Sequence, residues 1–401
     1  MAFVREQFPA FAEPGLKDQA FFENAGGSYA CQQVIDRLQS YYVKTKVQPY
    51  YPYPASSEAG EQMDTAYRRL AEYLGVTPDE VHIGPSTSQN TFVLARAFQN
   101  YLIDGEIVVT NQDHEANSGA WRRLAAEGVK VREWQVNHQT GRLSLTDLKP
   151  LLSGRTRLIC FPHASNIIGE VNPVAEICVL AHAVGALTVV DGVSYAPHGL
   201  SNVNDLGADI YLFSAYKTYG PHQGVMVVRA AAMSALSNQS HYFNDSYGHK
   251  RLIPAGPDHA QVAALQGVTD YFDALALHHF PDELEDKSRT VHGLFRNAER
   301  ELLAPLLEFL RAHPGIRIVG PDSAENRVPT VALLAEGHDP ERLVRGLNER
   351  GMMCGSGHFY AARLLTALGI SLDTGVLRLS LVHYTSVEDI ERLMTALGEL
   401  L

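Results

Sequence analysis

Short apolar runs rich in valine and isoleucine recur through the first 230 residues of the chain, and longer helical patterns separate them. This alternation predicts a largely parallel β-sheet with helices on both faces, because parallel strands need crossover connections that are usually helical. Seven runs are predicted to be strands: Val81 to Ile83, Ile107 to Thr110, Val131 to Val136, Leu158 to Pro162, Leu187 to Val190, Ile210 to Phe213 and Val225 to Arg229.

The composition changes after about residue 280, where a charged helix from Glu283 to Leu310 is predicted before a smaller α+β region. A chain of 401 residues more often forms two domains than one. We predict a large domain at residues 26–280 around a mostly parallel seven-stranded sheet, and a small C-terminal domain at 281–401. Residues 1–25 are predicted to pack on the small domain.

The net charge of the chain indicates which kind of partner it binds. Acidic residues number 45 against 33 basic ones, a net charge of −12 that would repel nucleic acid and anionic membranes and favours a small-molecule partner. The start lacks the apolar core of a signal peptide and no apolar run is long enough to span a membrane, so we expect a soluble, cytoplasmic protein.

The four cysteines lie far apart in the sequence and form no Cys-x-x-Cys pair. This pattern argues against a disulfide framework and a zinc knuckle, so we expect reduced thiols.

Lys217 is the most informative residue for function. It follows the predicted strand that ends at Phe213, in the segment Ser-Ala-Tyr-Lys, while Asp191 follows the apolar run Ala186 to Val190. Strand ends of an open α/β sheet converge on one crevice, so we expect both side chains there. A lysine among hydroxyls, with a carboxylate from a neighbouring strand, suits a Schiff base with pyridoxal 5'-phosphate (PLP). Asp191 would pair with the pyridinium nitrogen, and Ser214 is placed for the phosphate.

Two other predicted loops offer contacts for the same cofactor. In the loop that begins at Gly84, Ser86 or Thr87 can cap a helix whose free N–H groups would face a phosphate. The alternative is an ordinary helix cap. His114, after the next strand, offers a flat ring that could stack on a cofactor, and the alternative is a surface or core histidine.

Asn166 and Asp191 each have a second interpretation. Asn166 can hold a phenolic cofactor oxygen and a substrate carboxylate, or it can form an Asx turn before Gly169. Asp191 could instead cap a helix or bind a metal with the nearby His198. The chain has no His-Glu-x-x-His motif, P-loop or Gly-x-Gly-x-x-Gly fingerprint, so we predict no metal and no nucleotide cofactor.

Five motifs occur in order along the chain: Gly-x-Ser-Thr-x-x-Asn, Asp-His-x-x-Asn, Ser-Asn-Ile-Ile-Gly-x-Val-Asn-Pro, Asp-Gly-x-Ser and Ser-Ala-Tyr-Lys. In this combination the chain resembles the class V aminotransferase family of fold-type I PLP enzymes, which includes cysteine desulfurases and selenocysteine lyases. The resemblance runs from Phe22-Glu-Asn-Ala-Gly-Gly to Leu377-Arg-Leu-Ser. It implies a fold-type I architecture and a homodimer with active sites at the subunit interface.

The resemblance also implies a role for each matching residue. Lys217 would carry the cofactor, Asp191 would hold its ring nitrogen, and His114 would stack on its ring. Other cofactor contacts would come from Ser86, Thr87, Asn166, Ser194, Ser214 and Tyr216. Two of these depart from the family's desulfurases, which often have histidine where this chain has Tyr216 and glutamine where it has Ser194. Arg378 would clamp the substrate carboxylate, with Asn166 and Asn24 beside the substrate. An interdomain salt bridge is the alternative role for Arg378.

Cys354 is a candidate nucleophile. It lies in a glycine-rich stretch close to where one desulfurase subgroup keeps a mobile-loop cysteine, and the alternative is an inert buried thiol. The aromatic segment 47–54 corresponds to a stretch that approaches the active site in this family, often that of the partner subunit, and interface packing is its alternative role.

These features predict a PLP-dependent enzyme that acts on an amino acid. Lys217 would remove the Cα proton as a general base. We favour β-elimination or carbon–sulfur or carbon–selenium cleavage. A true aminotransferase and a catalytically silent PLP-binding protein are the alternatives.

Overall fold

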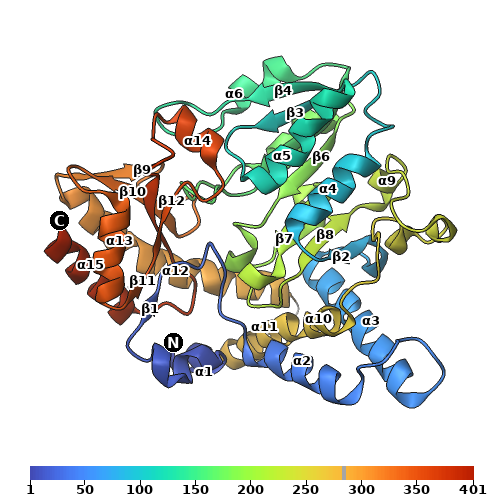
Figure 1. Cartoon of the computed structure of the whole chain (residues 1–401), viewed down its shortest axis with the longest axis horizontal. Coiled ribbons are helices and arrows are strands. Elements are labelled where there is room, and N and C mark those ends of the chain that lie inside the picture. Colours follow the sequence, from blue (N-terminus) through green and yellow to red (C-terminus); the bar gives the residue numbers. More distant parts are fainter. Residues whose placement is uncertain (282–285) are drawn as a thin grey trace.

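A seven-stranded sheet forms the centre of the computed structural model, which describes residues 1–281 and 286–401 (Figure 1). The strand order is β2-β8-β7-β6-β5-β3-β4. From β7 to β4 all neighbours are parallel, and β8 is antiparallel to both β7 and β2. The strands are β2 Val81–Gly84, β3 Glu106–Thr110, β4 Lys130–Trp134, β5 Thr156–Pro162, β6 Leu187–Asp191, β7 Ile210–Ser214 and β8 Gly224–Val228.

The predicted mostly parallel seven-stranded sheet is therefore confirmed, with each predicted strand in it. The predicted bounds differ by a few residues. The strand expected to reach Val136 ends at Trp134, because the Val136 N–H donates to the Asn111 side chain at 2.8 Å.

Alternate residues of each strand enter two separate cores on opposite faces of the sheet. In β7, Tyr211 and Phe213 belong to one core, and Ile210 and Leu212 belong to the other. This two-residue period places apolar side chains on both faces, which explains the continuous apolar runs in the sequence.

Helices cover both cores. The core that contains Tyr211 is closed by α2 Gln32–Lys44, α3 Pro54–Leu74, α7 Val174–His182, α10 His259–Ala264 and α11 Gln266–His279. The opposite core is closed by α4 Thr87–Ala97 and α5 Glu115–Arg123. Three short helices lie in connections: α6 Leu145–Leu148, α8 Val203–Leu206 and α9 Ala230–Met233.

The C-terminal region has its own antiparallel sheet, in the order β12-β13-β10-β9 (Figure 1). Its strands are β9 Ile316–Val319, β10 Thr330–Ala335, β12 Gly355–Gly357 and β13 Val376–Ser380, and its helices are α12 Lys287–Ala312, α13 Pro340–Glu349, α14 Ala362–Ala367 and α15 Val387–Leu400. The helix predicted from Glu283 begins at Lys287 in the structure, where Asp286 caps it through the Arg289 N–H. Residues 283–285 of that prediction lie outside the described residues.

The N-terminal segment contacts both regions. Helix α1 Ala2–Glu6 lies near α11 (Figure 1), where Phe3 stacks on His278, and Phe8 packs against Tyr219 in the large core. Further on, β1 Ala20–Phe21 pairs with β11 Met352–Met353 of the C-terminal region. These contacts are broader than the expected packing on the small domain alone. The boundaries at residues 25 and 280 stay predictions.

In the described part of the chain, no helix combines the length and the apolar character that a membrane span requires.

Candidate active site

A cavity of about 280 Å³ opens at one edge of the seven-stranded sheet. Strands β2, β3, β5, β6 and β7 point the same way, since β8 reverses direction between β2 and β7, and the loops after these five strands line the cavity. The lining residues are Ser86, Thr87, Ser88, Gln112, His114, Ala116, Pro162, Ala164, Asn166, Asp191, Val193, Ser194, Ser214, Tyr216, Lys217 and His222. The nine residues predicted to contact a cofactor are among them.

Lys217 ends a single 3-10 turn directly after β7 and is buried, with 7% of its surface exposed. Burial, and after it the nearby positive charge of Arg378, lower the pKa of its amine to about 8. The carboxylates of Asp191 and Glu23 oppose this shift. A substantial fraction of the amine is therefore neutral near physiological pH, which a lysine nucleophile or base requires.

Asp191 is the last residue of β6, and its Oδ1 accepts a hydrogen bond from the Val193 N–H at 2.9 Å. Burial raises its pKa to about 6, while the Val193 N–H and the charge of Lys217 lower it. Gly192 is required next to it, because a Cβ there would lie 2.1 Å from the Tyr211 ring. A buried carboxylate of this kind is stabilised by a cationic partner in the cavity.

The amino end of α4 faces the same cavity. Ser86 caps this helix by accepting from the Gln89 N–H at 3.2 Å, and the Thr87 and Ser214 hydroxyl oxygens are 2.8 Å apart. Hydroxyls together with the unpaired amides of a first helical turn form a site suited to a phosphate. The close approach of β8 requires Gly224, where a Cβ would lie 2.4 Å from the Thr87 nitrogen.

His114 presents a neutral ring. It caps α5 through Nδ1, which accepts from the Ala116 N–H at 3.1 Å, so the ring proton lies on Nε2. Burial lowers its pKa to about 3, and the positive charges of Lys217 and Arg378 contribute. An uncharged flat ring at this position can stack on an aromatic ligand.

Asn166 joins the cavity to the C-terminal region. Its Nδ2 donates to the Phe359 carbonyl at 2.9 Å, and its Oδ1 is buried without a partner among the described residues. A buried acceptor without a donor is costly, so a ligand that donates to Asn166 would stabilise the site.

Arg378 lies beside the cavity, on β13, with its side chain 3% exposed. Its Nη1 donates to the Asn166 carbonyl at 3.2 Å, and its Nη2 is 2.5 Å from Glu23 Oε1. The ring of Phe359 covers the guanidinium at 3.7 Å. The arginine therefore makes a salt bridge, but with Glu23 of the N-terminal segment rather than between the two predicted domains. Its positive charge still lowers the pKa of Lys217.

Two predicted site residues, Asn24 and Cys354, make contacts that stabilise the fold. The Asn24 amide donates to the backbone carbonyls of Phe21 and Ser380, and these two bonds use both of its side-chain N–H groups. Its side-chain oxygen accepts from the Tyr384 hydroxyl. Cys354 lies between β11 and β12 in the core of the C-terminal region, where burial raises the pKa of its thiol to about 12. The substrate contact of Asn24 and the nucleophile role of Cys354 stay predictions.

The sequence interpretation missed Gln112 and His222. Gln112 holds the loops together by donating to the Gly141 carbonyl at 2.9 Å and accepting from Asn172 at 2.7 Å. His222 stacks on Tyr216 with ring centroids 4.6 Å apart. Its position five residues after Lys217, within Gly-Pro-His-Gln, was the available signal.

His198, the suggested partner of Asp191 for a metal, hydrogen-bonds Glu299 instead, at 2.8 Å. Across residues 1–281 and 286–401, no group of three or more His, Cys, Asp and Glu side chains is arranged to hold a metal ion.

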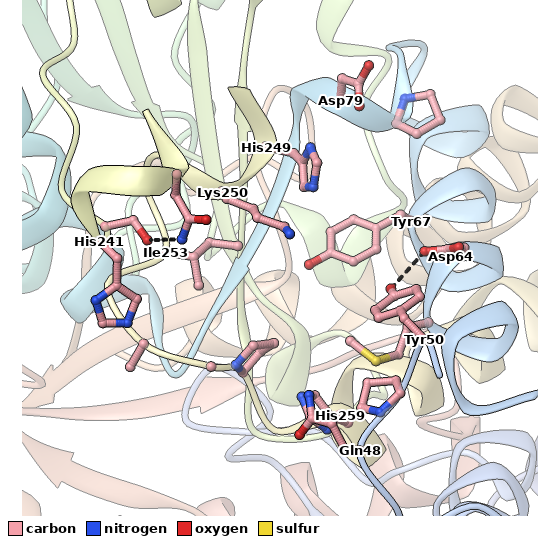
Figure 2. A pocket seen from close by; sticks show the side chains of 18 of the residues that line it. Gln48, Tyr50, Asp64, Tyr67, Asp79, His241, His249, Lys250, Ile253 and His259 are labelled. Carbon is pink, nitrogen blue, oxygen red and sulfur yellow. Dashed lines mark hydrogen bonds between the residues drawn. The ribbon is translucent and has the colours of Figure 1, made fainter. Parts of the chain in front are cut away.

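A second, larger cavity of about 680 Å³ lies between α3 and the segment 240–259 (Figure 2). Figure 2 shows Tyr67 and Lys250 pointing toward one another across it, and Tyr50 donates to Asp64 at 2.9 Å. Lys250 ends an exposed 3-10 turn, Gly248–Lys250, whereas Lys217 is buried just after a strand end. The smaller cavity therefore has the better features for catalysis.

The fold and the cavity define an α/β enzyme with a buried lysine and a buried aspartate at converging strand ends. The chain belongs to the class V aminotransferase family, whose model, described as aminotransferase class-V, matches residues 20–393. Members of this family are PLP-dependent enzymes.

Individual relatives cover the chain almost completely. An aminotransferase-like protein of Gibberella zeae is 35% identical over 408 residues, with 98% of this chain and 96% of that protein covered. A cysteine desulfurase-like protein of Aspergillus flavus is 29% identical over 419 residues, covering 99% of this chain and 90% of that protein. The apo cysteine desulfurase from Thermococcus onnurineus NA1 has the same fold, with a TM-score of 0.87 and 23% identity over 100% of this chain and 97% of that one.

In protein without cofactor, the Lys217 amine is expected to react with an amine-selective electrophile with a pH midpoint of about 8, because only the deprotonated amine is nucleophilic. Removing the positive charge by Arg378→Gln should raise the midpoint, and Asp191→Asn should lower it. Mass spectrometry of the Lys217 peptide after labelling at several pH values measures this. A midpoint near 10.5, the ordinary lysine value, would contradict the expected shift.

Proposed function

We propose that this protein binds PLP in the cavity of about 280 Å³ and uses it to eliminate a β-substituent from an amino acid. The observation that carries the proposal is Lys217, a buried lysine with a pKa of about 8 that shares one cavity with Asp191 and the amino end of α4. Membership of a PLP-dependent family supports the same cofactor.

The residues present fit the cofactor chemically. Asp191 is a buried carboxylate that suits a protonated ring nitrogen, and the neutral His114 ring suits an aromatic face. Ser86, Thr87 and Ser214 would hold the phosphate with the first amides of α4. Ser194, Tyr216 and the buried Asn166 oxygen are the further predicted contacts. When bound, PLP supplies a conjugated ring that draws electrons from the Cα of an amino acid.

Lys217 is the group that we propose to take up the Cα proton. A base with a pKa of about 8 is partly deprotonated near neutral pH and still basic enough to accept a proton. Its burial beside the cavity keeps water away from the amine.

Arg378 would bind the substrate carboxylate, because its planar fork suits bidentate recognition. A carboxylate held there fixes the orientation of the substrate, and orientation decides which Cα bond is broken.

The position of Cys354 bears on the reaction. Elimination needs no protein nucleophile, whereas persulfide formation needs a thiolate that can reach the substrate sulfur. Cys354 is 8% exposed in the small core, with a thiol pKa of about 12, which favours elimination without a protein thiol. Transamination is the second candidate function, supported by the 35% identical aminotransferase-like relative.

We also propose a homodimer. Tyr50, which lines the larger cavity (Figure 2), is 60% exposed, and Tyr51 next to it in the chain is 56% exposed. Tyr242 and Phe243 follow His241, another lining residue, and are 89% and 61% exposed. A monomer rarely exposes so many large aromatic side chains together, so we propose that they are buried in an interface with a second subunit. A cytoplasmic location stays a prediction.

Adding PLP to the purified chain is expected to give a visible absorbance band that Lys217→Ala abolishes near neutral pH, because the band requires the covalent link to the lysine. Lys250→Ala is the matched control, since that lysine lines the other cavity. Absorbance spectra test this, and a Lys217→Ala spectrum identical to the wild type would refute the cofactor assignment.

With amino acids that carry sulfur, selenium or oxygen at Cβ, the PLP-loaded protein is expected to release pyruvate continuously without added keto acid. The reason is that elimination returns the cofactor unchanged, while transamination converts it to its amine form. Assays for pyruvate, sulfide and alanine measure the outcome. Turnover that stops after one equivalent per site and resumes with a keto acid would identify an aminotransferase instead.

Cys354→Ala is expected to leave the rate of product release within about twofold of the wild type, since surface and small core changes away from reacting groups act mainly on stability. Cys178→Ala, another buried thiol, is the control for cavity effects. Loss of sulfide release in Cys354→Ala alone would restore the persulfide role.

A further inference from the structure

We propose that Glu23 is a specificity-determining residue: its carboxylate occupies part of the anion-binding edge of Arg378, and a substrate carboxylate must displace it. The inference rests on the proposed function, in which Arg378 is the site for that substrate group.

The guanidinium of Arg378 is only partly available for an incoming anion. Nη1 donates to the Asn166 carbonyl at 3.2 Å, and Phe359 covers one face at 3.7 Å. The remaining edge consists of Nε and Nη2, which together can bind two carboxylate oxygens side by side. Glu23 Oε1 already lies 2.5 Å from Nη2.

The Nε–Nη2 edge of Arg378 does not make all of its possible hydrogen bonds while Glu23 occupies it. Arg378 Nε and Glu23 Oε2 are both buried without a hydrogen-bond partner among the described residues. Glu23 therefore makes one contact where a bidentate carboxylate would make two. A ligand carboxylate on Nε and Nη2 would satisfy the arginine more fully.

The backbone is shaped to admit the Glu23 side chain. A Cβ on Gly26 would lie 2.6 Å from Glu23 Oε1, so a larger residue at position 26 would displace this carboxylate. The chain before Glu23 is fixed by the pairing of β1 with β11, and Glu23 itself bridges to Ser380, two residues from Arg378. These contacts direct the carboxylate toward the arginine.

Glu23 also has a route out of the site. Its side chain is 28% exposed, whereas the Arg378 side chain is 3% exposed, so displacement returns the glutamate to water while the arginine stays buried. Two carboxylates on one guanidinium edge would repel each other, which makes their binding competitive. Glu23 thereby weakens the binding of every carboxylate substrate and selects those with enough additional contacts to compete.

The test is binding of propanoate to the full chain as purified. Propanoate carries a carboxylate without an amine, so its binding requires no cofactor chemistry. Glu23→Gln is expected to lower the Kd for propanoate about tenfold, the change that corresponds to losing one competing contact. Glu23→Asp, which withdraws the carboxylate by one methylene, should also tighten binding. Ligand-observed NMR measures these constants.

Two further variants locate the effect. Glu341→Gln removes a glutamate from another arginine pair, with Arg345, and should leave the Kd unchanged. Arg378→Gln should abolish propanoate binding with or without Glu23→Gln. In the PLP-loaded enzyme, Glu23→Gln should lower KM about tenfold while kcat stays within about twofold, as expected when ground state and transition state are bound more tightly alike.

Propanoate binding that is unchanged or weaker in Glu23→Gln would overturn the proposal, because a residue that merely positions Arg378 would weaken binding when removed. Glu23→Asp binding no tighter than the wild type would equally refute direct occupancy. The Kd values can change as expected while Lys217→Ala leaves the absorbance spectrum with PLP identical to that of the wild type. In that case the proposed cofactor is wrong, and the competition between Glu23 and a carboxylate at Arg378 is still supported.

Discussion

Burial of the Lys217 amine is the constraint on which the rest of the site depends. Removing a cation from water is costly, so burial favours the neutral amine and the pKa of Lys217 is lowered to about 8. Arg378 reinforces this shift, while Asp191 and Glu23 limit it. The same burial raises the pKa of Asp191 to about 6, so the two groups lie closer in proton affinity than ordinary lysine and aspartate do. A cofactor that pairs with both would relieve two desolvation costs together.

The fold supplies this burial by bringing two regions together over one sheet edge. Two cores hold the strands from both faces, so the loops that carry Lys217 and Asp191 begin from a rigid base. The C-terminal region contacts two of the loops that form the cavity: Arg378 donates to the Asn166 carbonyl, and the Glu115 N–H donates to the Tyr360 carbonyl at 2.8 Å. In the proposed function, substrate recognition by Arg378 and proton transfer by Lys217 would therefore be provided by different regions of the chain.

The strands and the cavity could be predicted from the sequence, because apolar runs mark buried parallel strands and strand direction decides which loops meet. The contacts of Arg378 could not be predicted this way. Its partner Glu23 is 355 residues away, and no local pattern specifies such a pairing. Cys354 shows the opposite problem: its glycine-rich neighbourhood suggested a pliant loop, but β11 and β12 flank it and the small core buries it.

The most direct test of the central claim is to locate the cofactor on the chain. After incubation with PLP, sodium borohydride reduces the C=N bond between a lysine nitrogen and the former aldehyde carbon of PLP to a stable secondary amine. Peptide mass spectrometry then identifies the modified residue. The burial and lowered pKa of Lys217 predict one pyridoxyl group per chain, on the peptide that contains Lys217. Modification spread over exposed lysines, or none at Lys217, would contradict the assignment of this cavity as the active site.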